Sequence, residues 1–103
     1  MKVQINQHQY NALRKIWLYC FGNNSKHCTM ANHKFIQNIL ERGEDNREAY
    51  IQGYVNMKED KDHIFYSQPE KHAEHILSED CIKSVDLILE NKIDESIKFT
   101  KSL

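Results

Sequence analysis

Bulky apolar residues recur at steps of three and four along most of this chain, the spacing that places side chains on one face of an α-helix. Between these stretches stand Asn, Thr, Asp and Ser, which cap helices, while the 103-residue chain has only three glycines and one proline. Three glycines and one proline are too few turn-forming residues to join many short strands. The sequence therefore predicts an all-α fold, a bundle of five to six short helices in a single domain over residues 1–103.

The first helix has recognisable signals at both ends. Asn6 and Gln9 have the spacing of a capping box and predict its start. Its apolar stripe runs to Phe21 and includes Trp17, which we expect in the core. Gly22 follows, and we expect it to end the helix in a left-handed backbone conformation.

Two further helices are predicted between this end and the middle of the chain. Thr29 is a suitable N-cap for the second helix, and Gly43 is a suitable end. Asp45 and Glu48 form a capping-box pattern that predicts the start of the third. In the second helix, the residues expected to face the core are Met30, Phe35 or Ile36, Ile39 and Leu40.

The last part of the chain predicts three more elements and one exception. Residues 63–66 are short, aromatic and bracketed by polar residues, so a minor strand or hairpin is credible there. Helices are predicted over residues 70–77, after the N-cap Ser78, and over residues 93–103. In the last two helices, the residues expected to face the core are Ile82, Val85, Leu89, Cys81 or Ile88, Ile93, Ile97 and Phe99.

Charge is distributed unevenly along the chain, although the formal net charge is only −1. Residues 1–40 contain five basic residues and neither Asp nor Glu, whereas residues 41–103 contain nine basic and fifteen acidic residues. One interpretation is that the halves attract each other across the helix packing, where a surface ion pair contributes below about 1 kcal/mol. The other is that they form opposite faces, one of which steers a partner of opposite charge.

An acidic face would recognise a basic protein, such as a toxin or a nuclease. Its candidate residues are Glu41, Glu44, Asp45, Glu48, Glu59, Asp60 and Asp62. A basic face would instead meet phosphates. Its candidate residues are Arg14, Lys15, Lys26 and Lys34. These cations are sparse for a nucleic-acid domain, and the loop after Gly22 is longer than the turn of a helix-turn-helix motif. The sequence therefore favours a protein partner over a nucleic acid.

Six histidines and three cysteines raise the question of a metal site. Two groups have suitable residue types, namely Cys20, His27, Cys28 and His33, and His72, His75 and Cys81. Neither contains the closely spaced cysteine pair of zinc-finger sites. Cys20 also falls on the apolar stripe of the first helix, where a buried structural cysteine is the commoner outcome. We therefore predict no metal and no cofactor.

Catalytic signatures are missing from the sequence. It has no Gly-rich phosphate loop, no nucleophile elbow and no His-Glu-x-x-His motif. The carboxylate pairs Glu79–Asp80 and Asp94–Glu95 lie at expected helix starts, where the helix dipole already accounts for them. We expect the protein not to be an enzyme.

Aromatic residues are more numerous than one small core requires, and exposed Tyr and Trp side chains are frequent anchors of protein interfaces. The candidates for partner contacts are Tyr19, Tyr50, Tyr54, Phe65 and Tyr66. The alternative is that the tyrosines pack at the rim of the core with their hydroxyls in water.

Taken together, these features predict a protein that acts by binding another protein. We predict a small bacterial or phage inhibitor, immunity protein or antitoxin-like protein that masks its partner. A small nucleic-acid-associated regulatory protein using basic residues 1–40 is the first alternative, and a metal-dependent sensor using His and Cys is the second.

No segment approaches the ~20 apolar residues of a membrane span, and three cysteines are too few for a disulfide scaffold. We therefore expect a cytoplasmic protein without a membrane partner.

Overall fold

The computed structural model describes residues 4–43, 47–59 and 77–103, and all of the regular secondary structure in these ranges is helical. In chain order its elements are α1 (Gln7–Ile16), the π-helix η1 (Trp17–Phe21), α2 (Met30–Arg42), α3 (Arg47–Glu59), α5 (Glu79–Leu89) and α6 (Ile93–Ser102). The described residues contain no strand, so the predicted all-α fold is confirmed. The predicted strand at 63–66 and residues 70–76 of a predicted helix lie outside the described residues.

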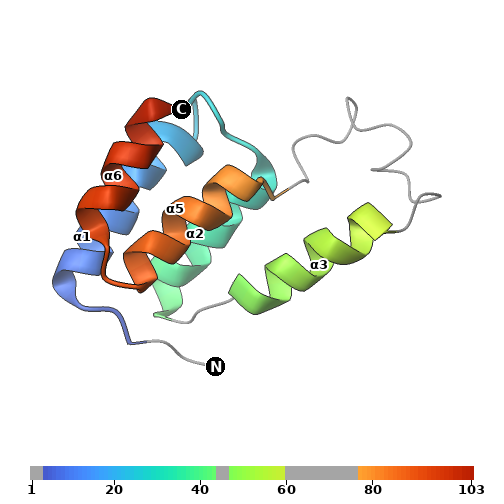
Figure 1. Ribbon diagram of the computed structural model, residues 1–103, viewed down its shortest axis with the longest axis horizontal. Helices are drawn as coiled ribbons and strands as arrows, with labels where there is room; N and C mark the ends of the chain where they lie inside the picture. Colours follow the sequence, from blue (N-terminus) through green and yellow to red (C-terminus); the bar gives the residue numbers. More distant parts are fainter. Residues whose placement is uncertain (1–3, 44–46, 60–76) are drawn as a thin grey trace.

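The helices pack around α1, which contacts α2, α5 and α6 (Figure 1). In addition, α5 packs against α6, and η1 packs against α2. The helix α3 lies beside this group, and an ion pair between Arg47 and Asp86, 2.9 Å long, joins its first turn to α5. Within the bundle, η1 and the last turn of α6 lie at the same end (Figure 1). None of the helices in the described ranges combines the length and apolar character needed to cross a bilayer.

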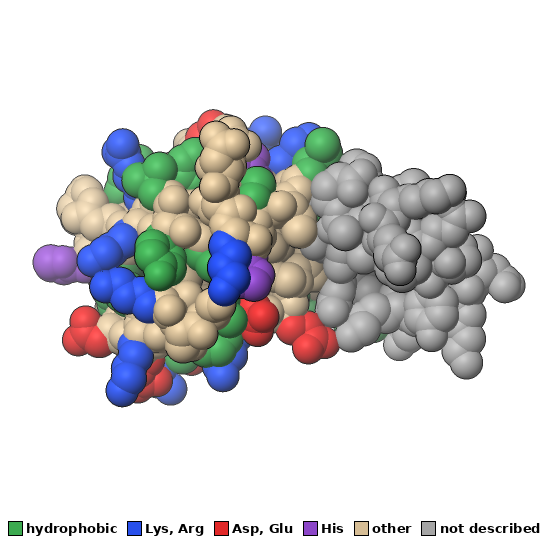
Figure 2. Space-filling model, turned by 90° about the horizontal axis from the view of Figure 1, so that it is seen from above, with side chains coloured by type: hydrophobic (Ala, Val, Ile, Leu, Met, Phe, Trp, Pro, Cys, Tyr) green, Lys and Arg blue, Asp and Glu red, His purple; other side chains and the backbone are tan. Residues whose placement is uncertain are grey.

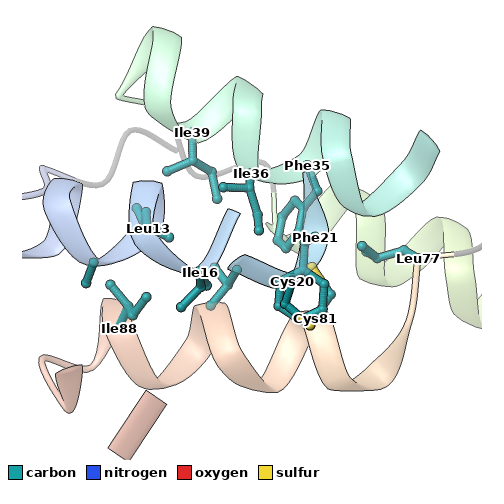
Figure 3. Close-up of a cluster of buried hydrophobic side chains, with 12 residues drawn as sticks. Leu13, Ile16, Cys20, Phe21, Phe35, Ile36, Ile39, Leu77, Cys81 and Ile88 are labelled. Carbon is teal, nitrogen blue, oxygen red and sulfur yellow. The ribbon is translucent and has the colours of Figure 1, made fainter. Parts of the chain in front are cut away.

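The core lies between α1, η1, α2 and α5, and its side chains meet as Figure 3 shows. Phe21 and Phe35 are its largest fully buried members. Burying a side chain of this kind contributes roughly 1.5–3 kcal/mol to folding. The buried apolar residues are Ala12, Leu13, Ile16, Cys20, Phe21, Phe35, Ile36, Ile39, Leu77, Cys81, Val85 and Ile88.

One core prediction for α2 is wrong. Met30 is 46% exposed, because it is the first residue of α2 and points away from the stripe of Phe35, Ile36 and Ile39. The inward position of this first turn is taken by Asn32, which is fully buried. In the first turn of α2 the residue that faces the core is therefore the polar Asn32, whereas the apolar pattern predicts Met30.

The packing of α6 also differs from the prediction. Three residues expected in the core are only half-buried: Ile93, Ile97 and Phe99. The fully buried side of α6 carries Ser96 and Thr100 instead, facing Ser84 of α5. Ser96 Oγ donates to Ser84 O at 2.6 Å, and Thr100 Oγ1 donates to Ser96 O at 2.8 Å. Small side chains with satisfied hydroxyls allow the two helices to approach closely, so the larger residues lie at the edges of the contact.

The capping box at the start of α1 is confirmed. Gln9 N–H donates to Asn6 Oδ1 and Asn6 N–H donates to Gln9 Oε1, both at 2.8 Å. Gln9 is also buried, and its Nε2 donates to Ile88 O of α5 at 3.1 Å. The same side chain therefore begins α1 and ties it to α5.

The ends of α2 and the start of α5 are confirmed too. Thr29 accepts a hydrogen bond from Asn32 N–H, and Ser78 accepts one from Cys81 N–H. Gly43 ends α2 with φ of +59°, the left-handed region that glycine adopts at little cost. The third helix begins at Arg47, and the proposed cap Asp45 lies outside the described residues.

Candidate partner-binding surface

The first helix changes its hydrogen-bonding pattern after Ile16 and continues as the π-helix η1. Gly22 N–H donates to Trp17 O, five residues back. In this wider turn two consecutive residues, Leu18 and Tyr19, face solvent and are 60% and 56% exposed. The next two residues of η1 are buried. Single π-turns are rare and occur often at functional sites.

A glycine is needed at position 22 because a side chain would not fit there, and not because of its backbone angles. Its φ of −88° and ψ of −176° are extended, so the predicted left-handed conformation is wrong. A Cβ at this position would lie 2.5 Å from Trp17 O and 3.1 Å from Trp17 Cδ2. The clash with a backbone oxygen cannot be relieved by turning a side chain. Gly22 therefore permits the close contact that ends η1.

We expect Gly22→Ala to lower the free energy of unfolding by about 1–3 kcal/mol, the usual range for overpacking. Chemical denaturation measures this loss. Gly43 offers the matched control, because a Cβ there meets nothing within 4 Å and the strain comes only from φ. Asn tolerates left-handed angles, so Gly43→Asn should cost less than Gly22→Asn. Equal losses at the two positions would contradict the steric explanation.

A narrow apolar slot opens beside Tyr19, between the end of α1 and α6. Its volume of about 30 Å³ is suited to the tip of one small aliphatic side chain. Two lysines from distant parts of the chain, Lys15 and Lys101, lie at its edges. The lining residues are Lys15, Ile16, Tyr19, Ile97, Thr100 and Lys101.

The loop after η1 is held against the same end of the bundle. Ser25 Oγ donates to Leu18 O at 3.2 Å, and Lys26 Nζ donates to Leu103 O at 2.7 Å. A third lysine is thereby placed near η1 and the end of α6. We use the name η1 surface for Lys15, Leu18, Tyr19, Lys26 and Lys101. Figure 2, which views this end from above, shows hydrophobic side chains lying between Lys and Arg side chains.

A larger and more open groove of about 450 Å³ continues from the slot along α1 and α6. It shares Lys15 and Ile97 with the slot. Its polar lining is mixed in charge, since His8, Lys15 and Asp94 all face it. This mixture selects no single kind of ligand, so the groove extends the η1 surface without defining a separate site.

The positively charged candidates of the sequence converge in part. Arg14 and Lys15 stand in the last turn of α1, and Lys26 lies in the following loop, whereas Lys34 is exposed on α2. The basic and acidic halves of the sequence interleave in space, because α5 and α6 pack against α1. Lys101 consequently joins the basic residues of the first half, which the sequence split does not reveal.

Of the predicted acidic face, the structure places three members. Glu41 is exposed near the end of α2, Glu48 is exposed at the start of α3, and Glu59 ends α3. Four others lie outside the described residues: Glu44, Asp45, Asp60 and Asp62. The aromatic candidates Tyr50 and Tyr54 lie in α3, while Phe65 and Tyr66 are outside the described residues. Recognition of a basic partner by this face stays a prediction.

The three cysteines are free thiols in different surroundings. Cys28 is exposed, whereas Cys20 and Cys81 are buried and their side chains meet in the core (Figure 3). Burial raises the pKa of both buried thiols, and that of Cys81 lies well above its ordinary value, with a further contribution from Cys20. Both therefore stay protonated and unreactive near neutral pH.

Among the described residues, no three His, Cys, Asp or Glu side chains are grouped to hold a metal ion. The metal-site candidates His72 and His75 lie outside the described residues.

Trp17 is the first residue of η1 and is not one of the fully buried core residues. It is half-buried, and its ring lies 5.1 Å from that of His33 on α2. In the part of the chain that the structure describes, three buried ring nitrogens have no hydrogen-bond partner: Trp17 Nε1, His27 Nε2 and His33 Nδ1. Trp17, predicted in the core, therefore packs against the core from its edge as a partly buried residue.

Sequence reasoning identified Tyr19, Lys15 and Lys26 but missed Leu18 and Lys101. The available signal for Leu18 was its position beside Tyr19, off the apolar stripe of the first helix. No protein-family model, curated protein or solved structure matches this chain.

Proposed function

We propose that this protein is a non-enzymatic binding module that docks another protein on the η1 surface. The observation that carries the proposal is the adjacent pair Leu18 and Tyr19, which are 60% and 56% exposed on a π-turn. Exposed large apolar side chains that lie together and are rimmed by polar groups are typical of interaction sites.

The surroundings of this pair support a protein interface. Tyrosine supplies a large, stiff contact area with a polar tip, and it is enriched among residues that dominate binding energy. The apolar slot beside Tyr19 can accept a partner side chain, while Lys15 and Lys101 form a charged edge. An apolar centre with a polar rim is the usual anatomy of such interfaces.

The surface is also firmly supported from below. Cys20 and Phe21 of η1 are buried in the core, and the loop hydrogen-bonds back to Leu18 O and Cys20 O. A preorganised surface loses little conformational entropy when it binds. This rigidity suits the stoichiometric masking of a target, as by an inhibitor, immunity protein or antitoxin-like protein. Its unpaired thiols suit a reducing compartment such as the cytoplasm.

We expect Leu18→Ala and Tyr19→Ala each to weaken binding of the native partner by about ten- to one-hundredfold, because each removes an anchor side chain. The thermal midpoint should change little, since both side chains are mostly in water. Calorimetric titration with the co-purified partner measures the affinity.

Met30→Ala is the matched control, because Met30 is 46% exposed but stands at the start of α2, outside the η1 surface. It should leave the affinity unchanged. Equal weakening by Met30→Ala, or full affinity in the Leu18→Ala, Tyr19→Ala double variant, would refute the proposed site.

A further inference from the structure

We infer that the η1 surface is specific for an acidic protein segment, one that carries carboxylates around a single exposed aliphatic side chain. This inference rests on the proposed function and names the chemistry of the partner. It combines two observations on the same surface, the charge around Tyr19 and the apolar slot beside it.

The charge around Tyr19 is positive. Lys15 and Lys101 line the slot, and none of the described residues that line it with them carries a carboxylate. Lys26 lies on the adjoining loop, where its Nζ donates a hydrogen bond to Leu103 O at the end of α6, at 2.7 Å. Charges of this kind attract a partner of opposite sign and speed its association.

Lys98 adds to this positive end of the bundle. It is exposed and precedes Lys101 by three residues on α6, the spacing of neighbours on one helix face. The acidic residues of α6, Asp94 and Glu95, stand in its first turn, at the opposite end of that helix. Lys101 in the last turn of α6 lines the slot with Tyr19, and Lys26 in the loop after η1 reaches the end of the same helix.

The slot explains why the partner is a protein segment. Its walls are apolar, and its volume of about 30 Å³ admits the end of a Val or Leu side chain. Nucleic acids stack their bases on aromatic rings in basic grooves, but Leu18, which is as exposed as Tyr19, offers no ring. Lysines at the edge and aliphatic surface at the centre fit carboxylates around an apolar residue better than a run of phosphates.

The test uses the full chain and three synthetic probes. The first is a short peptide of Glu and Ser with one central Leu, the second replaces that Leu with Ser, and the third is single-stranded oligothymidylate. Amide chemical shifts in NMR titrations report where each probe binds. We expect the first peptide to shift the resonances of Lys15, Leu18, Tyr19 and Lys101, and to bind at least about tenfold more tightly than the second.

Charge reversal then tests the lysines. We expect the double variant Lys15→Glu, Lys101→Glu to weaken binding of the first peptide by about tenfold or more at low salt, and physiological salt to reduce the difference. Lys92→Glu is the matched control, since Lys92 is exposed at the turn between α5 and α6. It should change the affinity less than about twofold.

Several results would overturn the inference. These are tighter binding of oligothymidylate than of the first peptide, equal binding of the two peptides, no peptide shifts on the η1 surface, or an effect of Lys92→Glu equal to that of the double variant. The proposed function is tested separately by the native partner. If that partner needs Leu18 and Tyr19 but is indifferent to the double charge reversal, docking on the η1 surface stands and only the acidic specificity falls.

Discussion

Replacing Phe35 by alanine is expected to lower the free energy of unfolding by about 3–5 kcal/mol, the range for removing a buried aromatic ring. Phe35 is fully buried and packs at the centre of the core with Phe21 and Ile36 (Figure 3). Small domains are stable by only about 5–15 kcal/mol in total. The variant should therefore unfold at a much lower denaturant concentration in a urea titration followed by circular dichroism.

Trp17 is less deeply buried than Phe35, which provides a comparison for this prediction. Trp17 is the larger side chain but is only half-buried, so Trp17→Ala should cost less than Phe35→Ala. The more conservative Phe35→Leu should also cost less, since it keeps most of the buried carbon. A larger loss for Trp17→Ala would show that η1, and not the α2 stripe, holds the centre of the core.

Replacing Asn32 by alanine is expected to cost about 3 kcal/mol, although Asn32 is polar, because buried groups lose their partners. The side chain is fully buried. Its Nδ2 donates to His27 O at 3.0 Å and to Ser78 Oγ at 3.1 Å, and its Oδ1 accepts from Ser78 N–H at 3.0 Å. One amide therefore joins the loop, the start of α2 and the residue that caps α5.

Two further variants separate these hydrogen bonds from simple loss of volume. Asn32→Leu keeps the volume but leaves His27 O and Ser78 N–H without that partner, so it should be about as destabilising as Asn32→Ala. Asn56→Ala removes an amide that pairs with Gln52 on the exposed side of α3, and it should change stability by less than about 0.5 kcal/mol. Wild-type stability in Asn32→Leu would contradict the proposed role of the amide.

Local chemistry made the helix starts predictable. The capping residues Asn6, Thr29 and Ser78 act on amides only three residues away, so their pattern is visible in the sequence. The main core stripe of α2 follows from the helical period in the same way. By contrast, the place of Asn32 depends on Ser78, 46 residues later, and no local pattern announces such a partner.

The π-turn and the packing of α6 were beyond local reasoning for similar causes. Gly22 looks like an ordinary helix end until the position of Trp17 O is known. On α6 the apolar pattern favours Ile93 and Ile97, but close contact with α5 selects the small residues Ser96 and Thr100. In both cases steric fit between elements overrides the simple ranking of side chains by hydrophobicity.

The candidate site was predictable only in part. The sequence marks Tyr19 as lying off the apolar stripe and Lys15 as basic, but it places Lys101 in the acidic half of the chain. Lys15 and Lys101 line the same slot because α6 packs along α1, a consequence of tertiary packing. Charge counted along a sequence does not predict a charged face when helices from both halves alternate in the bundle.

Photo-crosslinking from position 19 tests most directly whether the η1 surface is where the partner binds. A benzophenone amino acid would replace Tyr19 in one protein and Gln52, exposed on α3, in a second. The proteins would be irradiated in the cells that produce them. We expect one discrete adduct from position 19, which disappears when excess unmodified protein competes, and none from position 52. An adduct that forms from position 52 while position 19 gives none would contradict the account.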